Sequence, residues 1–201
     1  MLNQPDFYKY YSSIYGRFLF RWVDYSKIKL LEKEFNGLSN NKSKIILDLG
    51  CGTGKLGVKI SDRNYKTYFC DIEKRFLENI RKMGFQTILL DLSNNLPIKD
   101  NCIDGIILSD VIEHIINPNN LIHECYRVLK KNGKLIIFTP SHDKYRWRIA
   151  EKIHNILTKS NSGHITPFTY DLLNEVLGDC FERYIIKRLN FGLTICGIAI
   201  K

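Results

Sequence analysis

The sequence predicts an α/β protein built on a largely parallel sheet. Between residues 44 and 139, short apolar runs rich in β-branched residues alternate with segments of helical spacing, which is the pattern of βαβ units. One of these runs, residues 45–47, leads through Asp48 into a turn with glycines at alternate positions. No repeat, linker or low-complexity segment divides the 201 residues, so we expect a single domain over residues 1–201.

The first forty residues predict a helical extension that caps the sheet. Aromatic side chains recur there at intervals of three and four, which places them on one face of a helix; they are Phe7, Tyr11, Tyr15, Phe18 and Trp22. Packing of this face against the sheet is the plain interpretation. Residues 36–41 then read as a loop into the first strand.

The remaining elements follow from the same patterns. Later strands of the first half are expected at residues 67–70, 88–92, 106–109 and 134–137. Helices are expected from Lys55 and over residues 73–82. After Pro140 we expect, in order, an inserted amphipathic helix over 144–158, a turn at 160–163, a helix over 169–177 and strands at 184–186 and 193–200. Residues 44–139 therefore form the expected core, and residues 140–201 hold the insertion and the last two strands.

The glycine turn after the first strand is the most informative segment. Gly50, Gly52 and Gly54 allow positive φ and a close approach of the backbone to a ligand. The dinucleotide fingerprint spaces its third glycine one residue later, which disfavours a nicotinamide-dependent oxidoreductase. Asp48 before the turn suits a ligand with an ammonium group better than a pyrophosphate. A branched side chain at Gly50 is expected to occupy the place of that ligand.

Composition limits the class of protein. The apolar content of 44% and charged content of 25% are ordinary for a globular domain. No apolar stretch reaches the roughly 18 residues of a membrane span, and residues 1–6 lack the regions of a signal peptide. We therefore expect a cytoplasmic protein. The six cysteines show no Cys-x-x-Cys spacing, so neither a disulfide framework nor a zinc site is predicted.

The net charge of +9 favours acidic partners, such as nucleic acid, anionic lipid or an anionic metabolite. The basic residues are dispersed, however, and no run of five or six appears. A solvated basic face accounts for most of this charge. We expect a small molecule as the partner, for which an anionic compound is a candidate, and do not favour nucleic acid.

The glycine turn resembles motif I of the class I S-adenosylmethionine-dependent methyltransferases, and the resemblance extends from residue 45 to residue 181. It is similar to the type 11 and ubiquinone/menaquinone groups. Acids follow the second and third strands at Asp71 and Asp91, and residues 127–137 match the helix–turn–strand signature of the family. The resemblance implies a Rossmann-like sheet of seven strands in the order 3-2-1-4-5-7-6, with the last strand antiparallel and helices on both faces.

The resemblance also implies S-adenosylmethionine as the cofactor, S-adenosylhomocysteine as its product, and a set of cofactor-binding residues. Asp71 is expected on the ribose hydroxyls, Ile72 against the adenine and Asp91 on the adenine amino group. Tyr11 or Tyr15 is expected to close over the cofactor. The full expected set is Asp48, Gly50, Cys51, Gly52, Gly54, Asp71, Ile72, Asp91, Leu92, Ser109 and Tyr15.

Structural roles are open for the three acids. Asp48 is a candidate helix cap, Asp71 a candidate N-cap for the helix over 73–82, and Asp91 a candidate Asx-turn residue before Ser93. Three acids at the ends of successive parallel strands nevertheless favour a ligand site, because ligands of open α/β sheets bind there.

The acceptor side is expected at residues 109–114, immediately after the fourth strand. His114 is the candidate general base, since its ordinary pKa suits deprotonation near neutral pH. Glu113 is a second candidate catalytic residue, and the alternative is that both residues only orient the loop.

A metal site is the weaker hypothesis. Asp110, Glu113, His114 and His164 match the spacing by which two related methyltransferase groups hold Mg²⁺, except that those groups carry glutamate at the first position. We expect a metal-free enzyme.

Two further alternatives are a methyltransferase acting on RNA or an anionic lipid, and a non-catalytic binding module that keeps the fold. Retention of the glycines and of all three acids argues against the second.

Overall fold

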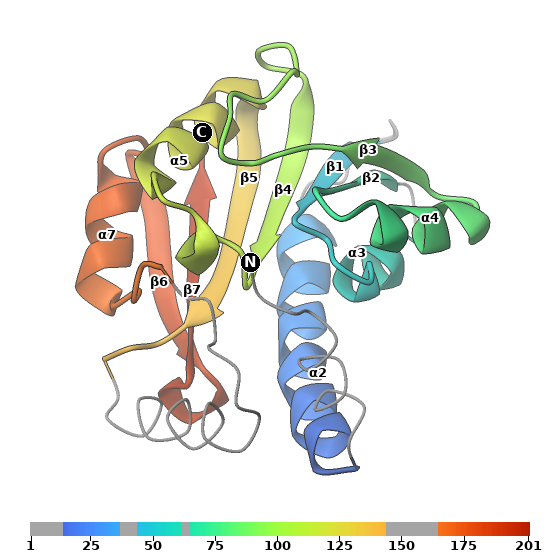
Figure 1. The fold of residues 1–201 in the computed structure, drawn as a ribbon. Helices are drawn as coiled ribbons and strands as arrows, with labels where there is room; N and C mark the ends of the chain where they lie inside the picture. The colour runs from blue at the N-terminus through green and yellow to red at the C-terminus, as the bar shows by residue number, and fades with distance from the viewer. Residues whose placement is uncertain (1–13, 37–43, 62–64, 144–164) are drawn as a thin grey trace.

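Seven strands form one twisted sheet in this computed structural model, which describes residues 14–36, 44–61, 65–143 and 165–201 (Figure 1). The side chains of residues 14–22 lie outside that description. The strands are β1 (Lys44–Leu49), β2 (Tyr65–Asp71), β3 (Gln86–Leu89), β4 (Ile103–Ser109), β5 (Leu129–Pro140), β6 (Arg183–Leu189) and β7 (Thr194–Ile200).

The order of the strands is β3-β2-β1-β4-β5-β7-β6. Strands β1 to β5 pair in parallel, whereas β7 runs antiparallel to both of its neighbours. The expected topology is confirmed. Because the parallel strands end at one edge, the segments that follow β1, β2, β3, β4 and β5 meet there.

Helices cover both faces of the sheet, as expected (Figure 1). The helices are α2 (Ile14–Asn36), α3 (Lys55–Ile60), α4 (Lys74–Lys82), α5 (Pro118–Val128) and α7 (Tyr170–Gly178), with 3-10 turns η1 (Ile112–His114) and η2 (Asn190–Gly192). Helices α2 and α3 share one core cluster with the sheet, and α5 and α7 share the other.

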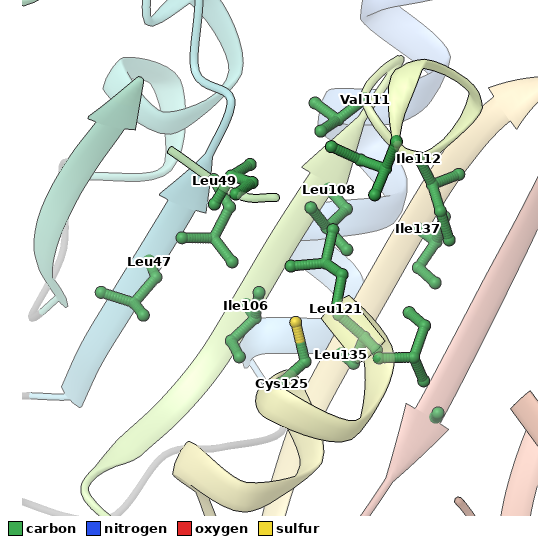
Figure 2. Packing of buried hydrophobic residues seen from close by; sticks show 14 of the residues in the cluster. Leu47, Leu49, Ile106, Leu108, Val111, Ile112, Leu121, Cys125, Leu135 and Ile137 are labelled. Carbon is green, nitrogen blue, oxygen red and sulfur yellow. The ribbon is translucent and has the colours of Figure 1, made fainter. Parts of the chain in front are cut away.

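Alternation along the strands divides their apolar side chains between the two cores. On β1, Ile46 belongs to the α2 side, whereas Leu47 and Leu49 face the α5 side. Figure 2 shows the second core, in which side chains of β1, β4 and β5 meet Leu121 and Cys125 of α5.

Helix α2 is an integral part of the first core. Leu31 and Phe35 are completely or almost completely buried, and they pack in a cluster with Ile46, Ile107 and Phe138. The carboxyl half of the helix therefore packs against the sheet, whereas packing of the aromatic stripe stays a prediction. The aromatic stripe lies outside the described side chains, so the lid hypothesis for Tyr11 or Tyr15 stays a prediction, as does the inserted helix over 144–158.

Two strands differ in extent from the expectation. The third strand ends at Leu89 rather than at residue 92. The Leu90 amide still donates to the Asp71 carbonyl of β2, but Asp91 already begins a turn. β5 begins at Leu129, within the run 127–137 that was expected to hold a helix end, a turn and the fifth strand, so the expected turn lies inside the strand.

The helix near the carboxyl end is confirmed with its cap. Thr169 lies in extended conformation, and its hydroxyl accepts a hydrogen bond from the Leu172 amide at 3.1 Å. None of the helices in the described ranges is long and apolar enough to cross a membrane.

Candidate active site

The three glycines after β1 have different surroundings. All have positive φ, at 67°, 52° and 75° for Gly50, Gly52 and Gly54. A Cβ atom on Gly50 would lie 2.4 Å from Val111 Cγ2, and one on Gly54 would lie 2.9 Å from Ile80 Cδ1. A Cβ atom on Gly52 would meet no atom of the described residues within 4 Å. Of the three, Gly52 is therefore the glycine in front of which the described residues leave space.

This corrects the expected effect of a branched side chain at Gly50. Such a side chain would collide first with Val111, a residue of the loop after β4, rather than with a ligand. Close packing of the glycine turn against that loop is what requires Gly50.

Asp71, at the end of β2, holds the glycine turn. Its Oδ2 accepts a hydrogen bond from the Gly52 amide at 2.8 Å, and its Oδ1 accepts one from the Glu73 amide at 2.8 Å. A carboxylate has about four acceptor positions, so two remain for ligand hydroxyls. Asp71 is not the N-cap of α4, because Glu73 caps that helix by accepting from the Arg75 amide.

Asp48 lies beneath the turn and is buried. Its Oδ2 accepts a hydrogen bond from the Gly57 amide in the first turn of α3 at 3.1 Å, whereas the N-cap residue of that helix is Gly54. Burial raises the pKa of Asp48 to about 7, and the nearby charge of Asp71 adds to this effect while the Gly57 amide opposes it. Contact of Asp48 with a ligand ammonium stays a prediction.

Cys51 lies between these two acids and is half-buried. Burial, together with the charges of Asp48 and Asp71, raises the pKa of its thiol, so the sulfur is neutral at physiological pH. Its Sγ lies 3.8 Å from the Gly52 carbonyl oxygen.

The ends of β2 and β3 bring the expected adenine residues together. The Leu90 amide donates to the Asp71 carbonyl at 2.9 Å, which sets Ile72 and Asp91 beyond neighbouring strand ends. Ile72 is 67% exposed although it is apolar, as an adenine-packing side chain requires. Asp91 is exposed and bonds the Ser93 amide at 2.9 Å, which confirms the Asx turn.

Leu92 has a different environment. Its side chain is buried in the core on the α5 side, so it has little surface for a cofactor.

The loop after β4 carries the acceptor-side candidates. Ser109 Oγ donates to Asp110 Oδ2 at 3.0 Å, and Asp110 has a φ of 55°, which is uncommon for a residue other than glycine. The Asp110 side chain is 51% exposed. Lys27 of α2 donates to Ser109 Oγ at 3.0 Å and forms an ion pair with Asp110.

Glu113 is completely buried, with its Oε2 accepting a hydrogen bond from Thr139 Oγ1 at 2.9 Å. Among the described residues its Oε1 has no hydrogen-bond partner. Burial raises the pKa of Glu113 to about 8, with a further rise from the Asp110 charge, and Thr139 and Lys27 oppose the shift. Burial therefore disfavours the charged form of this carboxyl, which has no surface for an acceptor in this conformation.

His114 is exposed and is held by its backbone, since its amide donates to the Val111 carbonyl at 2.9 Å. Of the two catalytic candidates, only His114 is thus accessible to an acceptor. Glu113 fits the alternative in which it orients the loop.

The metal hypothesis receives no support from the described residues, where no three His, Cys, Asp or Glu side chains are grouped to hold an ion. Its decisive residue, His164, lies outside them. The amides of Ile165 and Thr166 donate to the Glu113 carbonyl at 2.9 and 3.0 Å, so the chain just after His164 does reach the loop after β4.

Sequence reasoning missed Lys27 as part of this site and read it as one of a cluster of solvated basic residues. A signal was present, because Lys27 is spaced by four and eight residues from Leu31 and Phe35 on the buried face of α2.

Comparison with known proteins supports the same assignment. A family model described as a methyltransferase domain matches residues 47–137. A ubiquinone/menaquinone biosynthesis C-methyltransferase of Rickettsia prowazekii is 32% identical over 204 residues, covering 86% of this chain and 82% of that protein.

Other relatives are longer. An uncharacterized protein of Methanocaldococcus jannaschii is 33% identical over 144 residues, which cover 70% of this chain and 59% of the relative. The chain thus spans about three fifths of that relative's length. A crystal structure of a methyltransferase from Thermotoga maritima superposes with a TM-score of 0.73 at 20% identity, covering 93% of this chain and 94% of the other, and shows the fold alone.

The sheet order, the glycine turn with its acids and the Rickettsia relative agree with one another. The chain belongs to the class I S-adenosylmethionine-dependent methyltransferases, within the ubiquinone/menaquinone type.

Proposed function

We propose that this methyltransferase binds S-adenosylmethionine over Gly52 and transfers its methyl group to an oxygen or nitrogen atom of a small-molecule acceptor. The observation that carries the proposal is the space that the described residues leave in front of Gly52, beside a carboxylate with acceptor positions to spare. S-adenosylmethionine supplies a methyl group on a sulfonium, whose leaving group needs no further activation.

The residues at the edge of the sheet fit that cofactor. Asp71 offers two acceptor positions to the ribose hydroxyls, and Ile72 offers an exposed apolar surface to the adenine. The glycine turn leaves its backbone accessible at Gly52. Each group is presented by a strand end or by the turn after it, so binding requires little rearrangement.

The acceptor side favours a small molecule over a polyanion. Asp110 is half exposed there, and the neighbouring ammonium of Lys27 is buried and paired. Among the described residues at this point, a phosphate backbone would meet an acid and no accessible cation, which is unfavourable. An acceptor with an O–H or N–H group would find a hydrogen-bond acceptor instead.

Carbon methylation of a quinone-type ring is the second candidate. The Rickettsia relative is named a C-methyltransferase of ubiquinone and menaquinone biosynthesis, and it matches most of this chain. A quinol also presents O–H groups, so the same Asp110 would serve either reaction.

Two experiments test the proposal. Calorimetry should show S-adenosylhomocysteine binding at low micromolar concentration and no binding of NAD. Transfer of label from methyl-labelled S-adenosylmethionine should then be followed in separate pools of polar metabolites, quinone-containing lipid extract and RNA. Label in the metabolite pool supports the first candidate and label on a quinone ring supports the second, whereas label on RNA alone contradicts both.

A further inference from the structure

Helix α2 contacts three different segments at the edge of the sheet that holds the site (Figure 1). Asp24 forms an ion pair with Lys55, the first residue of α3 after the glycine turn. Ser26 Oγ donates to Asn190 Oδ1 at 2.8 Å, between β6 and β7. The third contact is that of Lys27 with Ser109 and Asp110 in the loop after β4.

The Lys27 contact is a buried one. The side chain is only 3% exposed, and its ammonium bonds Ser109 Oγ, pairs with Asp110 Oδ2 and lies 5.6 Å from the centroid of the Phe138 ring. An ammonium group removed from water is unfavourable unless its hydrogen bonds and charge are compensated, so these partners fix its position closely.

The partner acid is held in an uncommon conformation. Asp110 has a φ of 55°, and its amide donates to the Phe138 carbonyl at 2.8 Å. Backbone conformations of this kind persist only where surrounding contacts enforce them, and they concentrate at functional sites. Lys27 supplies such a contact, because it ties the Asp110 side chain to α2.

The same loop touches the cofactor turn. Val111 packs so closely on Gly50 that a Cβ atom there would lie 2.4 Å from it. This packing fixes Val111 on the glycine turn, so loss of Lys27 is expected to displace Ser109 and Asp110 rather than the cofactor-binding turn. Within the described residues both contacts of the Asp110 carboxylate use Oδ2, which leaves Oδ1 on a half-exposed side chain for a ligand.

We propose that Lys27 is a positioning residue for methyl transfer. From α2, its ammonium holds Ser109 and Asp110 so that Asp110 Oδ1 accepts a hydrogen bond from an O–H or N–H group of the methyl acceptor. This inference rests on the proposed function, and it adds to it a class of acceptor and a role for α2.

The test compares Lys27→Met and Lys27→Gln with Lys27→Arg, which keeps the charge. Lys130→Met is the matched control, since Lys130 also pairs with an acid of β4, Asp104, at 2.7 Å but near the opposite end of the strand. Hydrogen exchange of the Asp110 and His114 amides is measured at temperatures equally far below each variant's melting point, so that global destabilisation cancels.

We expect exchange of these two amides to be at least about tenfold faster in Lys27→Met and Lys27→Gln, and close to wild type in Lys27→Arg and in the control. If Lys27→Met does not fold, Lys27→Gln provides the same comparison. Unchanged exchange in the neutral variants, or equal acceleration in the control, would overturn the positioning role.

A second readout separates this inference from the proposed function. Calorimetry with S-adenosylhomocysteine should show Kd values within about threefold of wild type for Lys27→Gln, while kcat with the acceptor identified by labelling falls at least about tenfold and is restored by Lys27→Arg. Failure of the wild type to bind S-adenosylhomocysteine contradicts the proposed function. An unchanged kcat in Lys27→Gln contradicts the role of Lys27 alone.

Discussion

Substitution of Gly52 by alanine tests whether the open space at the glycine turn is the cofactor site. The added methyl group would meet no atom of the described residues within 4 Å, so the expected cost in the free protein is that of the backbone conformation. For a residue with φ near 52°, that cost is about 1–2 kcal/mol. With roughly 2–4 °C per kcal/mol for a chain of this size, the melting temperature should fall by about 2–8 °C.

Gly84 is a matched control. It also has a positive φ, 90°, and a Cβ atom there would likewise meet nothing within 4 Å. It lies in the turn between α4 and β3, at the edge of the sheet opposite to the glycine turn. Gly84→Ala should therefore lose a similar amount of stability and nothing in cofactor binding.

The assay combines melting temperatures without ligand and calorimetric titration with S-adenosylhomocysteine. Gly52→Ala should bind at least about tenfold more weakly than wild type, a change of about 1.4 kcal/mol, because its methyl group stands where the ligand would contact the backbone. If Gly52→Ala and Gly84→Ala bind equally well, the space in front of Gly52 is not the cofactor site.

Three more results are expected. Asp71→Asn should weaken S-adenosylhomocysteine binding by about 1–3 kcal/mol in calorimetry, since an amide cannot replace both accepting oxygens; equal affinities would remove Asp71 from the site. Asp48→Asn should raise the melting temperature at pH 8 and converge with wild type toward pH 4. The raised pKa of Asp48, about 7, lets the folded state bind more protons than the unfolded state between about pH 4 and 7. The free energy of unfolding of the wild type therefore falls as the pH rises through that window. A chelator should leave methyl transfer unchanged; loss that Mg²⁺ restores would instead support a cation site that includes His164.

Elements that are defined by interactions between neighbouring residues could be predicted from the sequence alone. Thr169 was identified as a cap because the interaction lies within four residues, and the end of β2 at Asp71 followed from an apolar run that stops at an acid. The order of the strands could not be predicted from local chemistry. Periodicity showed alternating strands and helices, but only the family resemblance placed β7 between β5 and β6.

The surroundings of the three glycines could not be read in advance. Their spacing showed that the backbone turns tightly, but not which of them would face a ligand and which would face Val111 or Ile80. Those contacts join residues that are far apart in the chain, so they depend on how the loop after β4 and helix α4 pack on the turn. The expected effect at Gly50 was wrong for this reason.

The different roles of the three acids could not be predicted from the sequence either, because they depend on burial and on nearby charges and amides. The sequence presents Asp48, Asp71 and Asp91 alike, each after a strand, but the structure gives them different tasks. Asp48 is buried beneath α3 with a raised pKa, Asp71 accepts from the Gly52 amide through Oδ2 and from the Glu73 amide through Oδ1, and Asp91 is an exposed turn residue. Burial and the direction of nearby amides, rather than residue type, decide which acid can serve a ligand. Asp71 combines backbone bonds that hold the glycine turn with acceptor positions left over, so its substitution should affect both the turn and the binding of a ligand.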